Sequence, residues 1–595
     1  MQPVRFTTMS IHPVPLARAA IALAFALVLS ACGGGGEVVV DPPRSAVSTT
    51  SLRALPAEYL ARKAVSYSPF RTANRDTEKA ALSDAAMKAN IKQDLDLLVA
   101  GNFKLIRLFD SSDEVSKRTL EVIRDNNLDI KVHLGAYVNS FKYALNPAVV
   151  ADIKAKNKQE LDRLVALASD PVFKNIVLTV SVGNETMVVW SIVPIEPVDM
   201  AGYITYVRDR VAQPVTTDDN FLFFATPPKI ITDVLDFVSI HTYAEIDTQF
   251  PASPYYWDWR QQAVAAGPAR AVAMMNAAMV ATRAQYQQVR DALDRKGLSA
   301  LPIVIGETGW NAVDVGKLRF RAHPSNQKLY YNRLETWRAE GRVGPGPANL
   351  FYFEAFDEPW KGGDDKWGLF NVAREARYVI QHLYSPAIWE TGTFTDAVAL
   401  FFSPPVPNAV FAANKYTLFS DAPGAVVATG LQLNAFDGTT ATRLDGPMSP
   451  PLSGDGTVAR EITPTPRDYG WGLLYDALSY GSENLSAFAA TGTINFLIKT
   501  TYPGKIEIGI STDTATGDVQ EAYLQIGNGD YGYHNDDAWH LVSIPLQSFL
   551  ALNPKLDLTL VLTRFAIADR YSFTGKPLNS GIATKIAIDG IQWSR

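Results

Sequence analysis

Short apolar runs alternate with amphipathic segments over residues 64–353. Eight such runs recur, each bounded by polar turn residues: 64–67, 105–109, 130–135, 176–182, 221–225, 237–241, 303–306 and 350–353. Runs of this length predict strands that are buried on both faces. Helix-like segments lie between most of them, for example residues 84–99, for which Ser83 is a predicted N-cap, and residues 157–168.

This alternation of strand and helix predicts parallel strand pairing. Eight repeats favour an α/β fold of the (β/α)8, or TIM barrel, type. The link between residues 225 and 237 is short, so that repeat should carry a stunted helix. The alternative is an open doubly wound sheet, which has less support because no Gly-x-Gly-x-x-Gly follows the first run.

The pattern changes after a proline-rich break at residues 404–407 (PPVP). From there to Arg595, short runs of alternating polarity are separated by Gly, Asp and Asn turns; the clearest cover residues 493–499, 505–510, 540–544 and 585–591. Such a pattern predicts an all-β sandwich with jelly-roll character.

The N-terminal segment has the pattern of a targeting sequence. An apolar run at residues 19–29 follows Arg5 and Arg18 and ends in Leu-Ser-Ala-Cys at Cys32. The run is short for a membrane span and suits a signal peptide. The tetrapeptide resembles the bacterial lipobox, in which the cysteine is lipidated. A cysteine in an ordinary secretory signal is the alternative.

Four regions are therefore predicted along the chain. They are a lipoprotein signal peptide (1–31), a flexible tether (32–52), the barrel (53–390) and the sandwich (400–595). Cys32 is the single cysteine, which excludes an intramolecular disulfide and a cysteine-based metal site. The residue directly after Cys32 is a glycine, and by resemblance to proteobacterial lipoproteins a glycine at this position favours the outer membrane. We therefore expect a lipid-anchored protein in the envelope of a Gram-negative bacterium.

Composition and charge exclude several classes of protein. Hydrophobic residues make up 47% and charged residues 19%, which is a globular balance rather than a disordered one. The net charge is 55 − 61 = −6, so the chain has no general field for polyanions and we expect no nucleic-acid partner. His-Glu-x-x-His and Gly-x-Ser-x-Gly are both absent, which argues against a zinc protease and a serine hydrolase.

Chemistry in a barrel takes place at the C-terminal ends of the strands. Glu185 ends the fourth predicted strand and Glu307 ends the seventh. Two carboxylates across a barrel mouth could stand about 5 Å apart, the separation that suits a retaining glycosidase. One would protonate the leaving oxygen and the other would attack the anomeric carbon, which requires different environments. The alternative for either residue is a glutamate that caps the next helix.

Further predicted substrate-binding residues share this rim, polar ones for hydrogen bonds and aromatic ones mainly for stacking: Arg107, Asn184, His241, Tyr67, Tyr243, Trp257 and Trp310. Asn184 could bind a sugar 2-hydroxyl, and Tyr243 could donate to the Glu307 carboxylate. Trp257 lies in an aromatic loop, residues 251–260, that could line an outer subsite. Packing of that loop against the next helix is the alternative.

Four motifs together resemble glycoside hydrolase family 17, the β-1,3-glucanases and glucan transglycosylases. They are YSPFR (67–71), VGNET (182–186), IGETGW (305–310) and FEAFDEPWK (353–361). The resemblance covers about residues 55–385.

This resemblance implies Glu185 as acid/base and Glu307 as nucleophile, with no cofactor or metal for catalysis. It also implies that Glu358 and Lys361 contact substrate or orient the nucleophile. One departure is that Asp364 and Asp365 stand where many relatives have a glutamate, and we assign them no catalytic role.

The sandwich resembles the galactose-binding-like carbohydrate-binding modules through residues 471–473, 539–542 and 588–593. A stacking platform could form from Tyr531, Tyr533 and His534 beside Trp539, whereas a core position is the better interpretation for Trp539 and Trp593. Asp589 is a candidate ligand for a structural Ca²⁺, as in related sandwiches.

These observations favour a monomeric, lipid-anchored enzyme that cleaves β-1,3-glucan of the laminarin type with retention. Transfer of the glucan to a sugar acceptor is the alternative with the same chemistry. A non-catalytic surface glucan-binding protein is the second alternative, and the presence of both carboxylates argues against it.

Overall fold

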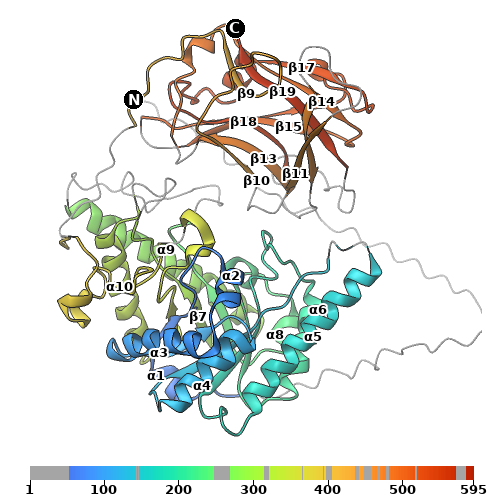
Figure 1. Cartoon of the computed structure of the whole chain (residues 1–595). Helices are drawn as coiled ribbons and strands as arrows, with labels where there is room; N and C mark the ends of the chain where they lie inside the picture. Colours follow the sequence, from blue (N-terminus) through green and yellow to red (C-terminus); the bar gives the residue numbers. More distant parts are fainter. Residues whose placement is uncertain are drawn as a thin grey trace, which may run out of the picture. The chain divides into compact units, whose positions relative to one another are not determined.

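The computed structural model describes most of the chain after residue 51. The described residues are 52–142, 144, 146–246, 268–313, 321–364, 366–392, 394–396, 405–435, 441–447, 457–464, 470–477, 481–515, 519–570 and 584–595. A (β/α)8 barrel occupies the first part and an all-β region the second, and each is considered by itself (Figure 1). The predicted signal peptide, Cys32 and Trp257 lie outside the described residues.

Eight parallel strands form the closed barrel. They are β1 (Lys63–Ser66), β2 (Phe103–Leu108), β3 (Lys131–Ala136), β4 (Val177–Asn184), β5 (Val215–Asn220), β6 (Val238–His241), β7 (Ile303–Thr308) and β8 (Leu350–Tyr352). Each pairs with the next in the sequence, and β8 closes the barrel on β1. The predicted fold class is therefore confirmed.

Of the α-helices described in this part of the chain, the first precedes β1 and the others lie between successive strands of the barrel. They are α1 (Ala57–Ala61), α2 (Arg75–Ala81), α3 (Asp84–Ala100), α4 (Arg118–Asp125), α5 (Pro147–Ser169), α6 (Pro197–Arg208), α7 (Phe221–Phe224), α8 (Lys229–Thr232), α9 (Pro268–Arg295) and α10 (Pro324–Gly341). The Ser83 hydroxyl accepts the N–H of Ala86 at 3.2 Å, as expected of the N-cap of α3. The stunted repeat is confirmed, since only α7 and α8, of four residues each, lie between β5 and β6.

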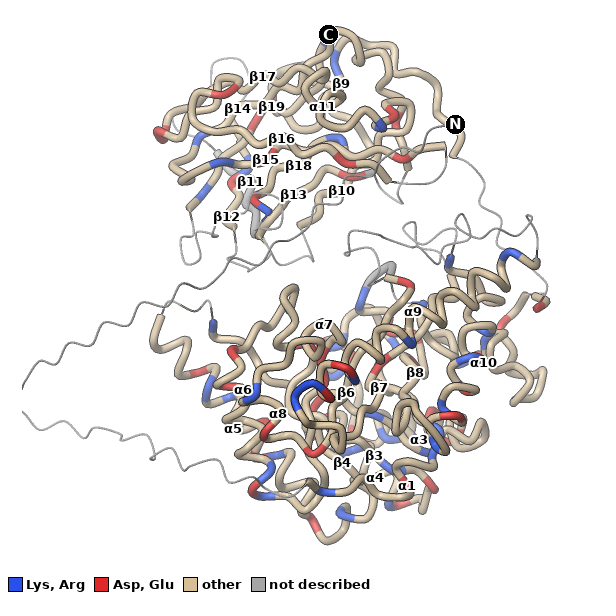
Figure 2. Tube along the Cα trace, turned by 180° about the vertical axis from the view of Figure 1, so that it is seen from behind, with Lys and Arg blue, Asp and Glu red and all other residues tan. Residues whose placement is uncertain are grey.

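The outer helical surface carries charges of both signs (Figure 2). Several belong to ion pairs one helical turn apart, such as Lys92 with Asp96 at 2.6 Å on α3 and Lys158 with Asp162 at 2.6 Å on α5. Exposed pairs of this kind contribute little stability, so the polar pattern marks the solvent face of each helix rather than a functional site.

The fifth strand differs from its prediction. The apolar run 221–225 was expected to form it, but β5 is Val215–Asn220, and the run forms α7. Asn220 causes the change of structure, because its side chain accepts the N–H of Leu222 at 3.0 Å and caps α7. The strand itself is polar in sequence yet fully buried, so a search for apolar runs overlooks it.

Two layers of side chains fill the barrel and its wall. Residues that face the helices, such as Val65 and Ile106, belong to a large apolar core. Their strand neighbours Ala64 and Leu105 belong to a separate small cluster with Phe351, which therefore lies inside the barrel because adjacent strand residues point to opposite faces. This apolar cluster fills the barrel interior below the polar residues at the strand ends.

The C-terminal region consists of antiparallel sheets, as predicted. Its strands are β9 (Lys415–Phe419), β10 (Leu431–Ala435), β11 (Ala441–Pro447), β12 (Val458–Pro464), β13 (Gly470–Ala477), β14 (Thr493–Thr500), β15 (Ile506–Thr512), β16 (Gln520–Ile526), β17 (His540–Pro545), β18 (Val561–Arg570) and β19 (Ile586–Ser594), with one helix, α11 (Leu546–Leu552). One sheet has the order β10-β13-β18-β15-β16; the other has β11-β12-β19-β14-β17, with β9 beside β19. Aromatic residues of both sheets, such as Phe496 and Phe565 at 5.2 Å between ring centroids, meet in one core.

No helix in the described part of the chain is long and apolar enough to cross a membrane.

Candidate active site

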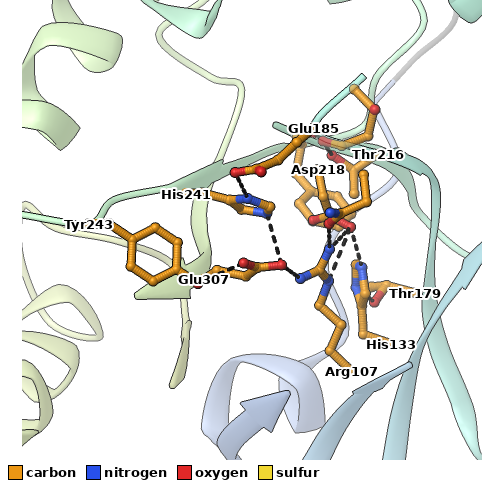
Figure 3. A network of polar contacts seen from close by, with 12 residues as sticks. Arg107, His133, Thr179, Glu185, Thr216, Asp218, His241, Tyr243 and Glu307 are labelled. Carbon is orange, nitrogen blue, oxygen red and sulfur yellow. Dashed lines mark hydrogen bonds and ion pairs between the residues drawn. The ribbon is translucent and has the colours of Figure 1, made fainter. Parts of the chain in front are cut away.

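Charged side chains gather where the barrel strands end (Figure 3). The strand register brings them to similar heights, because Asn184 is aligned with Asp218, and His241 with both Asn220 and Glu307. Most of these positions are buried, so their charges must be satisfied by one another rather than by water.

Glu307 on β7 is held by three neighbours. The Tyr243 hydroxyl donates to Oε2 at 2.7 Å, Arg107 donates to Oε1, and His241 Nε2 lies 3.6 Å from Oε1. Burial alone would raise the pKa of Glu307, but the charges of His241 and Arg107 and the two hydrogen bonds outweigh it, and the pKa is lowered. The carboxylate is therefore kept ionised although only 6% of the residue is exposed.

Glu185 has a more open environment. It follows β4 in a turn with positive φ angles at Gly183 (81°) and Glu185 itself (48°), and its N–H donates to the carbonyl of Asp218 at 2.8 Å. Its side chain is 35% exposed, and Oε1 lies 2.8 Å from His241 Nδ1. The two carboxylates thus have different environments: Glu185 meets solvent and Glu307 is enclosed.

His241 on β6 joins the two carboxylates. Its Nδ1 faces Glu185 and its Nε2 faces Glu307 (Figure 3). Burial would lower the pKa of the imidazole, but both carboxylates favour its charged form and the pKa is raised. An imidazolium here offsets part of the repulsion between the two acids.

The guanidinium of Arg107 on β2 is held in place by Asp218. Asp218 Oδ2 accepts from its Nε at 3.2 Å and lies 3.0 Å from Nη2, while Nη2 also donates to Asn184 Oδ1 at 2.5 Å and Nη1 reaches Glu307. The side chain is buried, and its pKa is raised because Asp218 and Glu307 outweigh the cost of burial. The guanidinium stays charged and its direction is set by Asp218.

Asp218 in turn is supported by His133 on β3, whose Nε2 lies 3.5 Å from Oδ2 and whose Nδ1 contacts the Thr179 hydroxyl at 2.8 Å. Burial raises the pKa of Asp218, but Arg107 and His133 outweigh it, and the pKa lies far below its usual range. Burial lowers the pKa of His133. A neutral His133 therefore supports an ionised Asp218.

Glu358 and Lys361 lie together on the segment after β8. Lys361 Nζ contacts the Glu358 carboxylate, lies 4.0 Å from Glu354 Oε2 and stands 4.4 Å from the Phe353 ring centroid. Burial would lower the pKa of Lys361, but Glu358, Glu354 and, more weakly, Glu307 raise it. Phe353 packs edge-on against Tyr243, with centroids 6.0 Å apart, and Tyr243 donates to Glu307, so this group adjoins the Glu307 carboxylate.

Two predicted stacking residues are in the core instead. Trp310 is 0% exposed, and its Nε1 donates to the Arg321 carbonyl at 3.1 Å. Tyr67 is 1% exposed, and its hydroxyl donates to Asp94 at 3.2 Å. Neither ring offers a face to a sugar, so the prediction of stacking is wrong for both.

The sequence analysis missed several residues of this site. Asp218 and Asp219 were overlooked because their strand was placed at residues 221–225. Two adjacent acidic residues directly before an apolar run were the signal available. Glu354 lies within the motif FEAFDEPWK (353–361), but no role was predicted for it, and none was predicted for Trp367. Trp367 packs edge-on against Tyr243 at 5.3 Å and completes an aromatic wall beside Glu307.

The predicted platform of the sandwich does not form as a unit. Tyr533 is 0% exposed while Tyr531 is 39% exposed. Trp593 is buried, with its Nε1 donating to the Arg564 carbonyl at 2.8 Å, in agreement with the core interpretation.

Asp589 is buried in β19 and accepts the N–H of Gly590 at 2.7 Å. Within the described residues, no group of three or more His, Cys, Asp or Glu side chains could hold a metal. The calcium site remains a prediction that rests on the family resemblance.

Comparison with known proteins adds two family matches. Residues 64–372 match the BtgE/BtgC glycoside hydrolase domain, and residues 420–595 match carbohydrate binding domain 30.

Curated relatives include glucan endo-1,3-beta-glucosidase, basic vacuolar isoform GLB, of Nicotiana tabacum, which is 29% identical over 123 residues (20% of this chain, 32% of that protein). Glucan endo-1,3-beta-glucosidase B of Solanum lycopersicum is 28% identical over 110 residues (18% of this chain, 29% of that protein). The matched segment thus spans about a third of the length of these relatives.

Solved structures with similarity include an endo-laminarinase from Formosa Hel1_33_131, at 26% identity over 54% of this chain and 86% of that one, with a TM-score of 0.47. An active-site mutant of the Rhizomucor miehei beta-1,3-glucanosyltransferase in complex with laminaritriose has 22% identity over 54% and 96% of the chains, with a TM-score of 0.37. A family 30 carbohydrate binding module has 18% identity over 30% and 99%, with a TM-score of 0.24.

Proposed function

Because this chain belongs to the BtgE/BtgC glycoside hydrolase domain family, we propose that it cleaves β-1,3-glucan with retention of anomeric configuration. The observation that carries the proposal is the pair Glu185 and Glu307, two carboxylates on one barrel rim, joined by His241 and placed in different environments. The names of the curated relatives, which are glucan endo-1,3-beta-glucosidases, support the choice of linkage.

Glu307 would act as the nucleophile. Its Oε1 or Oε2 attacks the anomeric carbon as the bond to the leaving oxygen breaks, giving a glycosyl ester. Tyr243 and Arg107 hold the carboxylate ionised and aimed before the reaction, so that little reorganisation is needed in the transition state.

Glu185 would act as the acid and then as the base. It protonates the glycosidic oxygen in the first step and takes a proton from the attacking water in the second. Its exposed side chain suits both tasks, because the leaving sugar and the incoming water approach from solvent. Asn184 is fixed by Arg107 through Oδ1, which directs its Nδ2 toward another acceptor, for which we propose the sugar 2-hydroxyl.

Transfer to a sugar hydroxyl would use the same intermediate. Incubation with β-1,3-linked oligosaccharides, followed by sizing of the products, separates the two outcomes, because products longer than the substrate require transfer. NMR of the first anomer released tests retention. Release of the inverted anomer, or no cleavage of any β-1,3-glucan, would overturn the proposal.

The roles of the two acids can be assigned by azide rescue. Glu307→Gly with azide should give an α-azide, because azide then takes the place of the missing nucleophile. Glu185→Ala should give a β-azide, because the ester on Glu307 still forms and azide attacks it. The opposite pairing of variants and products would exchange the roles.

We further propose that the C-terminal region holds the glucan chain and that Cys32 carries a lipid anchor to the outer membrane. The match to carbohydrate binding domain 30 supports the first proposal, and the lipobox-like sequence supports the second. Cys32→Ala should release the protein from the membrane fraction while activity on soluble oligosaccharides stays unchanged. A variant that still fractionates with the outer membrane would refute the anchor.

A further inference from the structure

Asp219 lies directly behind the turn that presents Glu185. It follows Asp218 on β5, and adjacent strand residues point to opposite faces, so one carboxyl group meets Arg107 and the other points away from it. Asp219 Oδ2 accepts the N–H of Met187 at 2.7 Å, two residues after Glu185. Asp219 Oδ1 accepts the N–H of Asn220 at 2.8 Å.

Strand β5 therefore accepts hydrogen bonds from the turn that carries Glu185 at two points. The carbonyl of Asp218 accepts from Glu185, and the carboxyl group of Asp219 accepts from Met187. The turn needs such support, because Glu185 has a φ of 48°, a conformation that residues other than glycine rarely adopt.

The charged groups around Asp219 also differ from those around Asp218. It is 0% exposed, and among the residues that the structure describes it forms no ion pair with a cationic side chain, whereas its neighbour Asp218 is paired with Arg107. Two charged side chains act on it from the packed elements: Glu185 after β4 disfavours its ionised form, and His241 on β6 favours it more weakly. The Glu185 carboxylate itself contacts His241 Nδ1 at 2.8 Å.

We propose that Asp219 is a positioning residue for the acid/base: its carboxyl group holds the turn that presents Glu185 to the glycosidic oxygen. The inference rests on the proposed role of Glu185.

Burial and the Glu185 charge raise the pKa of Asp219 to about 7. Asp219 is therefore largely protonated below neutral pH and holds the turn through its hydrogen bonds with the backbone N–H groups of Met187 and Asn220.

The test is kcat/KM of the full-length chain carrying Asp219→Ala on two substrates, a β-1,3-oligosaccharide and a 2,4-dinitrophenyl glycoside of the same sugar. A sugar leaving group needs a proton from Glu185, whereas dinitrophenolate departs without one. We expect a loss of about tenfold or more on the oligosaccharide and little change on the aryl glycoside. An equal loss on both substrates would mean a merely structural role and would overturn the proposal.

A matched control is Asp236→Ala, near the other end of β5. Asp236 is also buried and accepts a backbone N–H, that of Val215 at 2.9 Å, but it does not belong to the active-site network. It should lower the melting temperature and leave the ratio of kcat/KM on the two substrates unchanged. A change of that ratio in this variant as well would mean that general loosening of β5 causes the effect, and would overturn the proposal.

A second measurement needs neither substrate nor a variant of Asp219. Infrared difference spectra of the wild-type chain across pH 5 to 9 should show a carboxyl group titrating near neutrality, and Glu185→Gln should move that titration to lower pH. An unchanged titration would mean that Asp219 does not lie beside Glu185 and would refute the positioning role. If the titration moves but no glucan is cleaved, the placement of Asp219 stands and the proposed function fails, so the two outcomes are distinguishable.

Discussion

If Glu307 is the nucleophile as proposed, we expect its hydrogen bond with Tyr243 to set the pH at which activity is lost on the acid side. Tyr243 donates to Glu307 Oε2 at 2.7 Å inside a buried site, and this bond is one of the causes that lower the pKa of the carboxyl group. Tyr243→Phe removes only the hydroxyl and keeps the ring that packs on Phe353 and Trp367.

The magnitude follows from the charge on the acceptor. A hydrogen bond to a charged group contributes about 1.5–3 kcal/mol, and one pKa unit corresponds to about 1.4 kcal/mol. Loss of the donor should therefore raise the pKa of Glu307 by about one to two units. The nucleophile acts as the anion, and activity is lost as pH falls through its pKa. A raised pKa thus moves the acid limb to higher pH.

The assay is the pH profile of kcat/KM, which reports groups of the free enzyme. Tyr67→Phe is the matched control, since Tyr67 is also buried and donates to a carboxylate, Asp94, at 3.2 Å outside the active site. The acid limb should move in Tyr243→Phe and stay in place in Tyr67→Phe. If Tyr243→Phe lowers activity at every pH without moving the limb, the hydroxyl does not set the ionisation of Glu307 and the reasoning is wrong.

Three further outcomes are expected. Asp218→Asn removes the main partner of buried Arg107 and should cost about 3–5 kcal/mol of unfolding free energy in urea titration, together with most of the turnover. Arg374 donates to the buried Asp94 carboxylate at 2.9 and 3.0 Å, and Arg374→Ala removes both hydrogen bonds. This variant should lower the free energy of unfolding by about 3 kcal/mol and leave the pH profile of kcat/KM unchanged. A chain ending at residue 396, if circular dichroism shows it folded, should keep its activity on short oligosaccharides and lose activity on long glucan, because a second attachment on the same polymer raises the effective concentration; equal activity on both would refute a glucan-binding role for the C-terminal region.

The barrel and its acidic pair could be predicted because both follow from simple geometry. Parallel strands covered by helices are buried on both faces and read as apolar runs, and the residues that end them share one rim. Glu185 and Glu307 could therefore be placed together from their positions after the fourth and seventh runs, before any contact was known.

The fifth strand could not be found in this way because its burial does not depend on apolar side chains. Asp218 and Asp219 are 0% exposed, yet each carboxyl group has partners that come from other strands and turns far away in the sequence. The apolar pattern therefore predicts the strand at residues 221–225, directly after the polar residues that form β5.

Aromatic residues pose the opposite difficulty. The sequence shows that Trp310 and Tyr67 flank the catalytic motifs, but not whether a ring faces solvent or the core. Trp310 packs on Tyr330 with centroids 5.0 Å apart, and Tyr67 packs on Phe356 at 6.0 Å. Their place in the motifs is explained by support of the strand ends, since a rigid wall behind the rim keeps the carboxylates in position.

The buried polarity of β5 and the chemistry of the rim have one cause. If Glu307 were the single partner of this arginine, both side chains could change conformation together, and the orientation of the ion pair would not be fixed. Asp218 binds two nitrogens of Arg107 from behind and fixes the plane of the guanidinium, so the remaining donors can lie only toward Glu307 and Asn184. Burying this charge pair costs desolvation energy that a hydrophobic pair would not cost. This cost is offset in the site, because the Glu307 carboxylate is enclosed from water and needs a cation of fixed direction to remain ionised. The ionised state is the one in which a nucleophile can react.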